Sequence, residues 1–175
     1  MRTLILGGAR SGKSALAERL AHESGHPVTY IATAQAHDGE MAARIAHHRA
    51  SRPAHWVSVE EPLALAAVLR AHARPGHCVL VDCLTLWLSN LLGAEDPSLL
   101  ARERDALLAA LPSLTGQVML VSNEVGLGVV PMGELTRRFV DEAGRLHQAL
   151  AASCERVVLV AAGLPLTLKN ESRHP

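Results

Sequence analysis

The chain has 175 residues, of which 49% are hydrophobic and only 2% aromatic, and its 17 basic side chains balance its 17 acidic ones. This length predicts a single domain with a core of aliphatic side chains. The charge balance argues against a protein that coats nucleic acid or binds an acidic membrane through a general electrostatic field. Cys78 and Cys83 flank an apolar run, which indicates buried, reduced thiols.

No targeting or membrane-spanning segment is predicted. The apolar run near the start is too short for a secretory signal, because glycines follow it at once. No run reaches the ~18 apolar residues that a transmembrane helix needs, and Asp82 interrupts the best candidate. We therefore expect a cytoplasmic protein without membrane insertion.

Short β-rich runs alternate with amphipathic segments of helical length along the chain. Strands are predicted at 3–6, 28–31, 78–82, 117–122 and 156–161, with a weaker candidate at 56–59. Helices are predicted at 13–23, 38–50, 61–73, 97–110 and 133–152. Several of the strands are continuously apolar, as expected when both faces of a parallel sheet are covered. The alternation predicts an α/β protein built from right-handed βαβ units.

The residues after the first predicted strand match the pattern G-x-x-x-x-G-K-[ST] in full. They are Gly7, Gly8, Ala9, Arg10, Ser11, Gly12, Lys13 and Ser14. Between a strand and a helix, this pattern predicts a loop whose backbone N–H groups surround the phosphates of a nucleotide. Lys13 is expected to reach the β- and γ-phosphates, and Ser14 to ligate Mg²⁺. The match predicts a triphosphate site without identifying the reaction.

Asp82 closes the apolar run at 78–82. A carboxylate at the end of a buried strand beside a phosphate loop is the usual second support for Mg²⁺. The alternative is that Asp82 caps a helix at 83–92. The Asn-Lys-x-Asp pattern of regulatory GTPases does not occur in the sequence.

Histidines and arginines cluster at 44–56, where His47 and His48 would point about 100° apart on a helix. One interpretation is an ordinary solvated helix end. A zinc site fits the spacing poorly. Clamping of phosphates by neighbouring arginines (Arg44, Arg49 and Arg52) is a third. The fourth is a nucleophilic histidine that attacks the α-phosphorus of a triphosphate and expels pyrophosphate. The residues alone leave these four interpretations open.

Glu124 lies in a glycine-containing segment that follows the predicted strand at 117–122. Because ligands of α/β sheets bind at the carboxyl ends of the strands, this carboxylate is a candidate contact for substrate or metal. A carboxylate that only caps its own loop is an equally good interpretation.

Six blocks, in order, resemble one known family. They are GGARSGKS (7–14), YIATAQ (30–35), DGEMAARIAHHRASRPAHW (38–56), VLVDCLTLWLSNLL (79–92), VSNEVGLGVVP (121–131) and GLPLTLK (163–169). The family is the bifunctional adenosylcobinamide kinase/adenosylcobinamide-phosphate guanylyltransferase of cobalamin biosynthesis. One departure is His147, on a predicted helical face where the family often has Asn.

The resemblance implies a P-loop NTPase (RecA-like) three-layer fold with a mostly parallel sheet, in a single domain at 1–169 with a tail at 170–175. It implies that the enzyme phosphorylates adenosylcobinamide with ATP or GTP. It also implies that GMP passes from GTP to a histidine and then to adenosylcobinamide phosphate. The products are adenosylcobinamide-GDP and pyrophosphate, and the expected assembly is a homotrimer.

By the same resemblance, His47 is the histidine that carries GMP. The other nucleotide-binding positions that it implies are Thr33, His48, Arg49, Ala50, Ser51, Glu60 and Asp82, besides the phosphate loop. A monofunctional P-loop small-molecule kinase, in which His47 only binds phosphate, is the alternative. A RecA-type protein that hydrolyses nucleotide on DNA is a third hypothesis, which the balanced charge disfavours.

Overall fold

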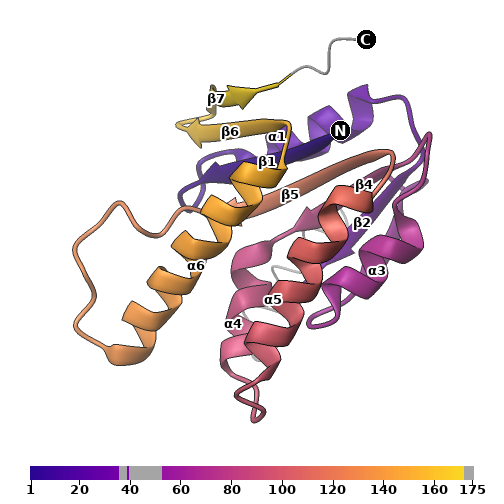
Figure 1. Cartoon of the computed structure of the whole chain (residues 1–175). Helices are drawn as coiled ribbons and strands as arrows, with labels where there is room; N and C mark the ends of the chain where they lie inside the picture. The colour runs from indigo at the N-terminus through magenta and orange to yellow at the C-terminus, as the bar shows by residue number, and fades with distance from the viewer. Residues whose placement is uncertain (36–38, 40–52, 172–175) are drawn as a thin grey trace.

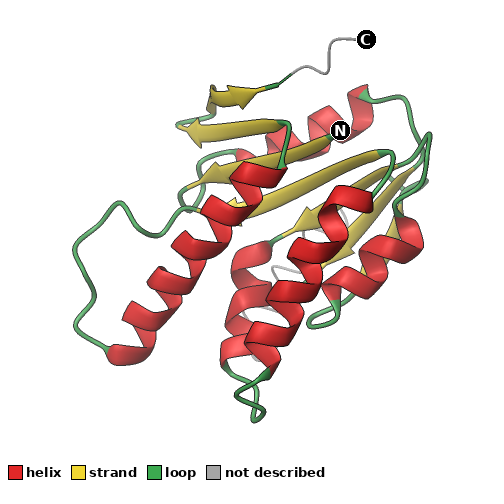
Figure 2. Ribbon diagram, viewed as in Figure 1, coloured by secondary structure: helices red, strands yellow, loops and turns green. Residues whose placement is uncertain are grey.

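A computed structural model describes residues 1–35, 39 and 53–171, and one twisted sheet forms its middle layer (Figures 1 and 2). The strands are β1 (Arg2–Gly7), β2 (Val28–Ala32), β3 (Val57–Glu60), β4 (Cys78–Asp82), β5 (Gln117–Asn123), β6 (Arg156–Ala161) and β7 (Leu164–Asn170). Their order is β3-β2-β4-β5-β1-β6-β7, and all neighbours are parallel except β6 and β7. The predicted mostly parallel sheet is confirmed.

Helices cover both faces of the sheet. They are α1 (Lys13–Glu23), α3 (Leu65–His72), α4 (Leu84–Leu92), α5 (Leu99–Ala110) and α6 (Glu134–Ser153), with a short 3₁₀ helix, η1 (Leu111–Ser113), after α5. In Figure 1, α3 to α6 lie on the near face, whereas α1 lies behind the sheet. The result is the three-layer arrangement expected from the sequence.

Alternate residues of each central strand enter two different cores. Leu4 and Leu6 of β1 pack with side chains from α3 to α6, whereas Ile5 packs with Leu16 and Ala17 of α1. All of these aliphatic side chains are buried. Because successive side chains of a strand point to opposite faces, a continuously apolar strand is what a sheet between two helical layers requires.

Two boundaries differ from the predictions. The helix expected at 61–73 begins only at Leu65, because the Glu61 carboxylate accepts the N–H groups of Leu63 and Ala64, at 2.8 and 2.7 Å, and holds a turn there. The strand β7 was not predicted, and its side chains are mostly exposed. The predicted helix at 38–50 lies outside the described residues apart from position 39.

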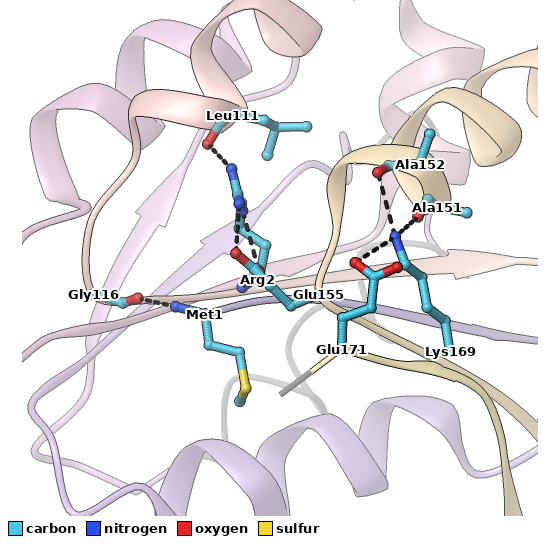
Figure 3. A network of polar contacts seen from close by, with 9 residues as sticks. All are labelled: Met1, Arg2, Leu111, Gly116, Ala151, Ala152, Glu155, Lys169 and Glu171. Carbon is cyan, nitrogen blue, oxygen red and sulfur yellow. Dashed lines mark hydrogen bonds and ion pairs between the residues drawn. The ribbon is translucent and has the colours of Figure 1, made fainter. Parts of the chain in front are cut away.

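The parallel strands all start at the same edge of the sheet, which is here called the amino end. Charged groups at this end are paired within the chain. Arg2 of β1 donates to both carboxylate oxygens of Glu155, at 2.5 and 3.1 Å, and to the carbonyl of Leu111 at 3.0 Å (Figure 3). The Met1 ammonium donates to the carbonyl of Gly116 at 2.7 Å. The opposite side, the carboxyl end, is where the phosphate loop, Glu60 and Asp82 lie.

No helix among the described residues is long and apolar enough to cross a membrane.

Candidate active site

The phosphate loop joins β1 to α1. Arg10 and Gly12 have positive φ angles of 56° and 95°, and the Ser11 N–H donates to the carbonyl of Gly8 at 3.2 Å. Left-handed residues alternating with right-handed ones turn successive backbone N–H groups toward one concavity, which then binds anions. The loop predicted from the sequence therefore has the backbone shape that phosphate binding needs.

Close packing explains why two positions of the loop are occupied by glycine. A Cβ atom on Gly7 would lie 2.4 Å from the hydroxyl oxygen of Ser11 and 2.6 Å from the carbonyl oxygen of Val160. A Cβ atom on Gly12 would lie 3.2 Å from the Cα of Gly163, in addition to the cost of its positive φ. By contrast, no atom lies within 4 Å of a Cβ built on Gly8.

Gly163, in the turn between β6 and β7, supports the loop from outside. Its N–H donates to the carbonyl of Ser11 at 2.8 Å, and its φ of 79° is one that only glycine adopts readily. No role was predicted for Gly163 from the sequence. A glycine after a buried parallel strand was the available signal, but the partner lies about 150 positions away in the chain.

Lys13 and Ser11 are buried polar residues at the mouth of the loop, each 8% exposed. The Lys13 ammonium donates to the carbonyl of Gly8 at 3.1 Å. The Ser11 hydroxyl oxygen has no hydrogen-bond partner among the described residues. Because buried polar atoms are nearly always paired, this hydroxyl is a candidate contact for a bound ligand. Ser14, half-buried, lies one residue after Lys13 at the start of α1.

The carboxyl ends of neighbouring strands bring the remaining predicted residues into one row. Asp82 pairs in register with Ala32 of β2 and Val121 of β5, and Glu60 also pairs with Ala32. Asn123 pairs with Gly7. The strand β5 thus separates the loop strand β1 from the strand that ends in Asp82. The N-cap residue of α4 is Cys83 and no side chain caps that helix, so the proposal that Asp82 caps it is wrong.

Thr33 is fully buried, and its hydroxyl is paired with backbone groups. It donates to the carbonyl of Cys83 at 2.6 Å and accepts the Cys83 N–H at 3.0 Å. Asn90 of α4 donates to the Thr33 carbonyl at 2.8 Å. Thr33 therefore fixes the chain that follows Asp82.

Glu60 is exposed at the end of β3, on the outer side of the row. The predicted nucleophile His47 and its neighbours His48, Arg49, Ala50 and Ser51 lie outside the described residues. Arg44 and Arg52 also lie outside them.

A buried polar network that was not predicted from the sequence links α6 to β5. His147 of α6 is 7% exposed and its Nε2 lies 2.8 Å from the hydroxyl of Ser122, which lies 3.2 Å from the hydroxyl of Thr85. The Thr85 oxygen accepts the Asn123 N–H at 2.6 Å. The Nδ1 of His147 lies 3.7 Å from Oε2 of Glu124.

Burial lowers the pKa of His147, and the nearby Glu124 carboxylate opposes that effect only in part. His147 was expected to be a residue on a helical face without a role. It is instead buried against β5, and a serine inside an otherwise apolar strand was the signal that a polar partner faces it.

Glu124 has two further contacts. Its N–H donates to the carbonyl of Gly7 at 3.0 Å, which places it directly beside the first residue of the loop. Its Oε1 accepts the Gly126 N–H at 2.6 Å, so the carboxylate does cap its own loop. The side chain keeps 22% of its surface exposed.

A parallel sheet with a phosphate loop after its first strand and an acidic residue at the end of β4 defines a P-loop nucleotide-binding protein. The family model described as cobinamide kinase / cobinamide phosphate guanyltransferase, CobU, matches residues 3–168. The chain belongs to this family.

Curated relatives match nearly full length. The chain is 69% identical over 171 residues to the bifunctional adenosylcobalamin biosynthesis protein CobP of Pseudomonas aeruginosa, a match that covers 98% of this chain and 99% of the relative. It is 43% identical over 182 residues to the bifunctional adenosylcobalamin biosynthesis protein CobU of Escherichia coli K12, covering 97% and 100%.

Solved structures with the same fold are far more distant in sequence. The RadB recombinase aligns with a TM-score of 0.51 at 18% identity, covering 90% of this chain and 73% of that one. The P4 protein of bacteriophage phi6, in complex with ADP, aligns with a TM-score of 0.50 at 19% identity, covering 94% and 53%. These similarities confirm the P-loop NTPase fold.

Proposed function

We propose that this chain carries out both reactions of its family, phosphorylation of adenosylcobinamide and transfer of GMP from GTP to adenosylcobinamide phosphate. The observation that carries the proposal is the phosphate loop at 7–14 within a chain that matches the cobinamide kinase / guanyltransferase family over residues 3–168. One nucleotide site serves both steps, with ATP or GTP in the first and GTP in the second. The products are adenosylcobinamide-GDP and pyrophosphate.

In the kinase step, the loop backbone binds the phosphates and Lys13 neutralises charge on the γ-phosphate. For this, the Lys13 ammonium exchanges the carbonyl of Gly8 for phosphate oxygens. Because the side chain is buried, its charge acts in a medium less polarisable than water and stabilises the transferring group strongly. The unpaired hydroxyl of Ser11 is available as a further donor.

Ser14 and Asp82 are the residues proposed to hold Mg²⁺. A hydroxyl and a carboxylate are oxygen ligands of the kind that Mg²⁺ prefers, and both lie at the carboxyl end of the sheet. The described residues contain no group of three or more His, Cys, Asp or Glu that could hold a metal ion. Bound Mg²⁺ would neutralise charge on the nucleotide phosphates.

In the transfer step, we propose that the imidazole of His47 attacks the α-phosphorus of GTP. The bond from this phosphorus to the α–β bridging oxygen breaks, and pyrophosphate leaves with the electron pair. The nucleotide remains on the histidine as a phosphoramidate until the phosphate of the corrinoid attacks it. His48, Arg49, Ala50, Ser51 and Glu60 are proposed to bind the nucleotide around this step. Thr33, predicted as a further nucleotide-binding residue, is proposed to act by positioning the chain after Asp82.

Incubation with α-labelled GTP tests the transfer step. We expect acid-labile, base-stable label on the protein, and no label on His47→Ala. A monofunctional kinase would phosphorylate adenosylcobinamide without ever carrying label. Guanylylation of preformed adenosylcobinamide phosphate by His47→Ala would contradict the assignment of the nucleophile.

A homotrimer is proposed as the assembly. Its support is exposed apolar surface: Leu164, Leu166 and Leu168 of the edge strand β7 are 72%, 59% and 56% exposed. Exposed alternate leucines on an edge strand favour association. Light scattering on Leu166→Glu tests whether β7 takes part, and we expect a smaller species than for the unchanged chain.

A further inference from the structure

The side chain that receives the proton of the attacking hydroxyl is not among the residues assigned above. In a kinase reaction the acceptor hydroxyl must approach the γ-phosphate at the carboxyl end of the sheet. The strand β5 ends there, between β1 with its loop and β4 with Asp82. Its last residue is Asn123, and Glu124 follows directly, hydrogen-bonded through its N–H to Gly7.

A second observation shows that the site extends across the end of β5. The amide oxygen of Asn123 is buried and has no hydrogen-bond partner in the part of the chain that the structure describes. It lies in register with Gly7. Together with the unpaired hydroxyl of Ser11, it gives two buried oxygens without partners among the described residues, one in the phosphate loop and one at the end of β5.

One direction of hydrogen bonding uses every donor of the buried network. In it, the Thr85 oxygen accepts the Asn123 N–H and the Thr85 hydroxyl donates to Ser122. The Ser122 hydrogen is then left to donate to Nε2 of His147. A neutral imidazole carries one proton, so this arrangement places it on Nδ1.

The Nδ1–H of His147 consequently points at Glu124. The distance from Nδ1 to Oε2 is 3.7 Å, and the other carboxylate oxygen accepts the Gly126 N–H. The Gly126 N–H therefore holds one carboxylate oxygen, and the other faces His147 at a distance longer than a hydrogen bond. Since only 22% of the side chain is exposed, few waters compete for this orientation.

We propose that Glu124 is the catalytic base of the kinase step and that His147 is its positioning residue, an inference that rests on the proposed function. The acceptor oxygen attacks the γ-phosphorus while its proton passes to the Glu124 carboxylate. The bond between the γ-phosphorus and the β–γ bridging oxygen breaks, and its electron pair stays on the departing nucleoside diphosphate. The products are the phosphate ester and the diphosphate, and Glu124 then returns the proton to solvent.

The first test measures the two activities separately on the full chain. Phosphorylation is followed with γ-labelled ATP in the absence of GTP, and guanylyl transfer with GTP and preformed adenosylcobinamide phosphate. We expect Glu124→Gln to lower the kcat of phosphorylation by about 100-fold or more, with a much smaller change in KM for adenosylcobinamide. Transfer should fall far less, and Glu134→Gln, an exposed carboxamide control on α6, should leave both rates unchanged.

The second test separates positioning from packing. The amide of His147→Asn lies near the position of Nδ1 and can still donate to Glu124, whereas that of His147→Gln lies near Nε2 and can still pair with Ser122. We expect His147→Asn to keep phosphorylation within about threefold of the unchanged chain and His147→Gln to lower kcat by about tenfold. Thermal unfolding shows whether either variant is destabilised.

Each outcome supports or overturns the role proposed for Glu124 or for His147. Phosphorylation that is retained in Glu124→Gln overturns the role of Glu124 and leaves the proposed function in place. A larger loss in His147→Asn than in His147→Gln, or a parallel loss of both activities with stability, assigns His147 to packing alone and overturns its positioning role. No phosphorylation by the unchanged chain overturns both the inference and the proposed function.

Discussion

The polar groups named at the two ends of the sheet differ in whether they have hydrogen-bond partners within the chain. At the amino end, Arg2 is paired with Glu155 and Leu111, and the Met1 ammonium is paired with Gly116 (Figure 3). At the carboxyl end, the hydroxyl of Ser11 and the amide oxygen of Asn123 are buried without partners among the described residues. The amino-end groups named here are paired within the chain, whereas these two carboxyl-end oxygens lie beside the loop where we propose that the nucleotide binds. Stability and catalysis are therefore separable by substitution.

Two lysines make the sharpest comparison. We expect Lys13→Ala to lower kcat/KM of both reactions by about 1,000-fold or more, because the phosphates lose their buried cation. Stability should change by less than ~1 kcal/mol, since Lys13 donates only to the carbonyl of Gly8 among described groups. Rates and thermal unfolding on one preparation check both parts.

Lys169 is the matched control at the amino end. Its ammonium donates to the carbonyls of Ala151 and Ala152, at the end of α6, at 3.1 and 3.3 Å. A cation near a helix C-terminus contributes about 0.3–1 kcal/mol, so Lys169→Ala should lose that stability and keep both activities. Equal loss of activity in the two variants would contradict the comparison.

Two glycines extend the comparison of the two ends of the sheet to the backbone. A Cβ at Gly116 would lie 2.3 Å from the carbonyl oxygen of Arg74, and the φ there is 79°. We expect Gly116→Ala to lose about 1–3 kcal/mol of stability while its folded fraction keeps full activity. Gly7→Ala, which forces Ser11 and Val160 apart, should lose stability and activity together. Denaturant unfolding and rates per folded molecule distinguish the two.

The last expected effect is a pH dependence of stability at the amino end. Arg2 holds the pKa of Glu155 at about 2, far below its usual value. Because the folded pKa is depressed, the pair stabilises the fold fully above pH ~4.5 and loses this contribution as pH falls toward 2. Glu155→Gln should cost about 1–2 kcal/mol at pH 7 and almost nothing near pH 2. A difference that is constant with pH would rule out the ion pair as its source.

The sequence predicted those elements whose essential residues lie close together in the chain. The phosphate loop needs glycines, Lys13 and a following helix within eight residues, so the sequence displays it directly. The strands of the sheet centre are continuously apolar because both of their faces are covered. Asp82 was predicted as a site residue because it is a carboxylate at the end of a continuously apolar run.

Features that depend on distant partners could not be predicted in this way. The strand β7 contains a proline and exposed leucines, and only its pairing with β6 makes it a strand. His147 looked like any polar residue on a helix until α6 packed its side chain against Ser122 of β5. Gly163 supports the phosphate loop from the far end of the chain.

The support from Gly163 has a consequence for how the protein is made. The phosphate loop is synthesised before its supports, because β1 is flanked by β5 and β6 and the carbonyl of Ser11 receives its partner from residue 163. Closing a contact of such long sequence separation slows folding. A nascent chain therefore carries the binding motif before residue 163 is available to support it.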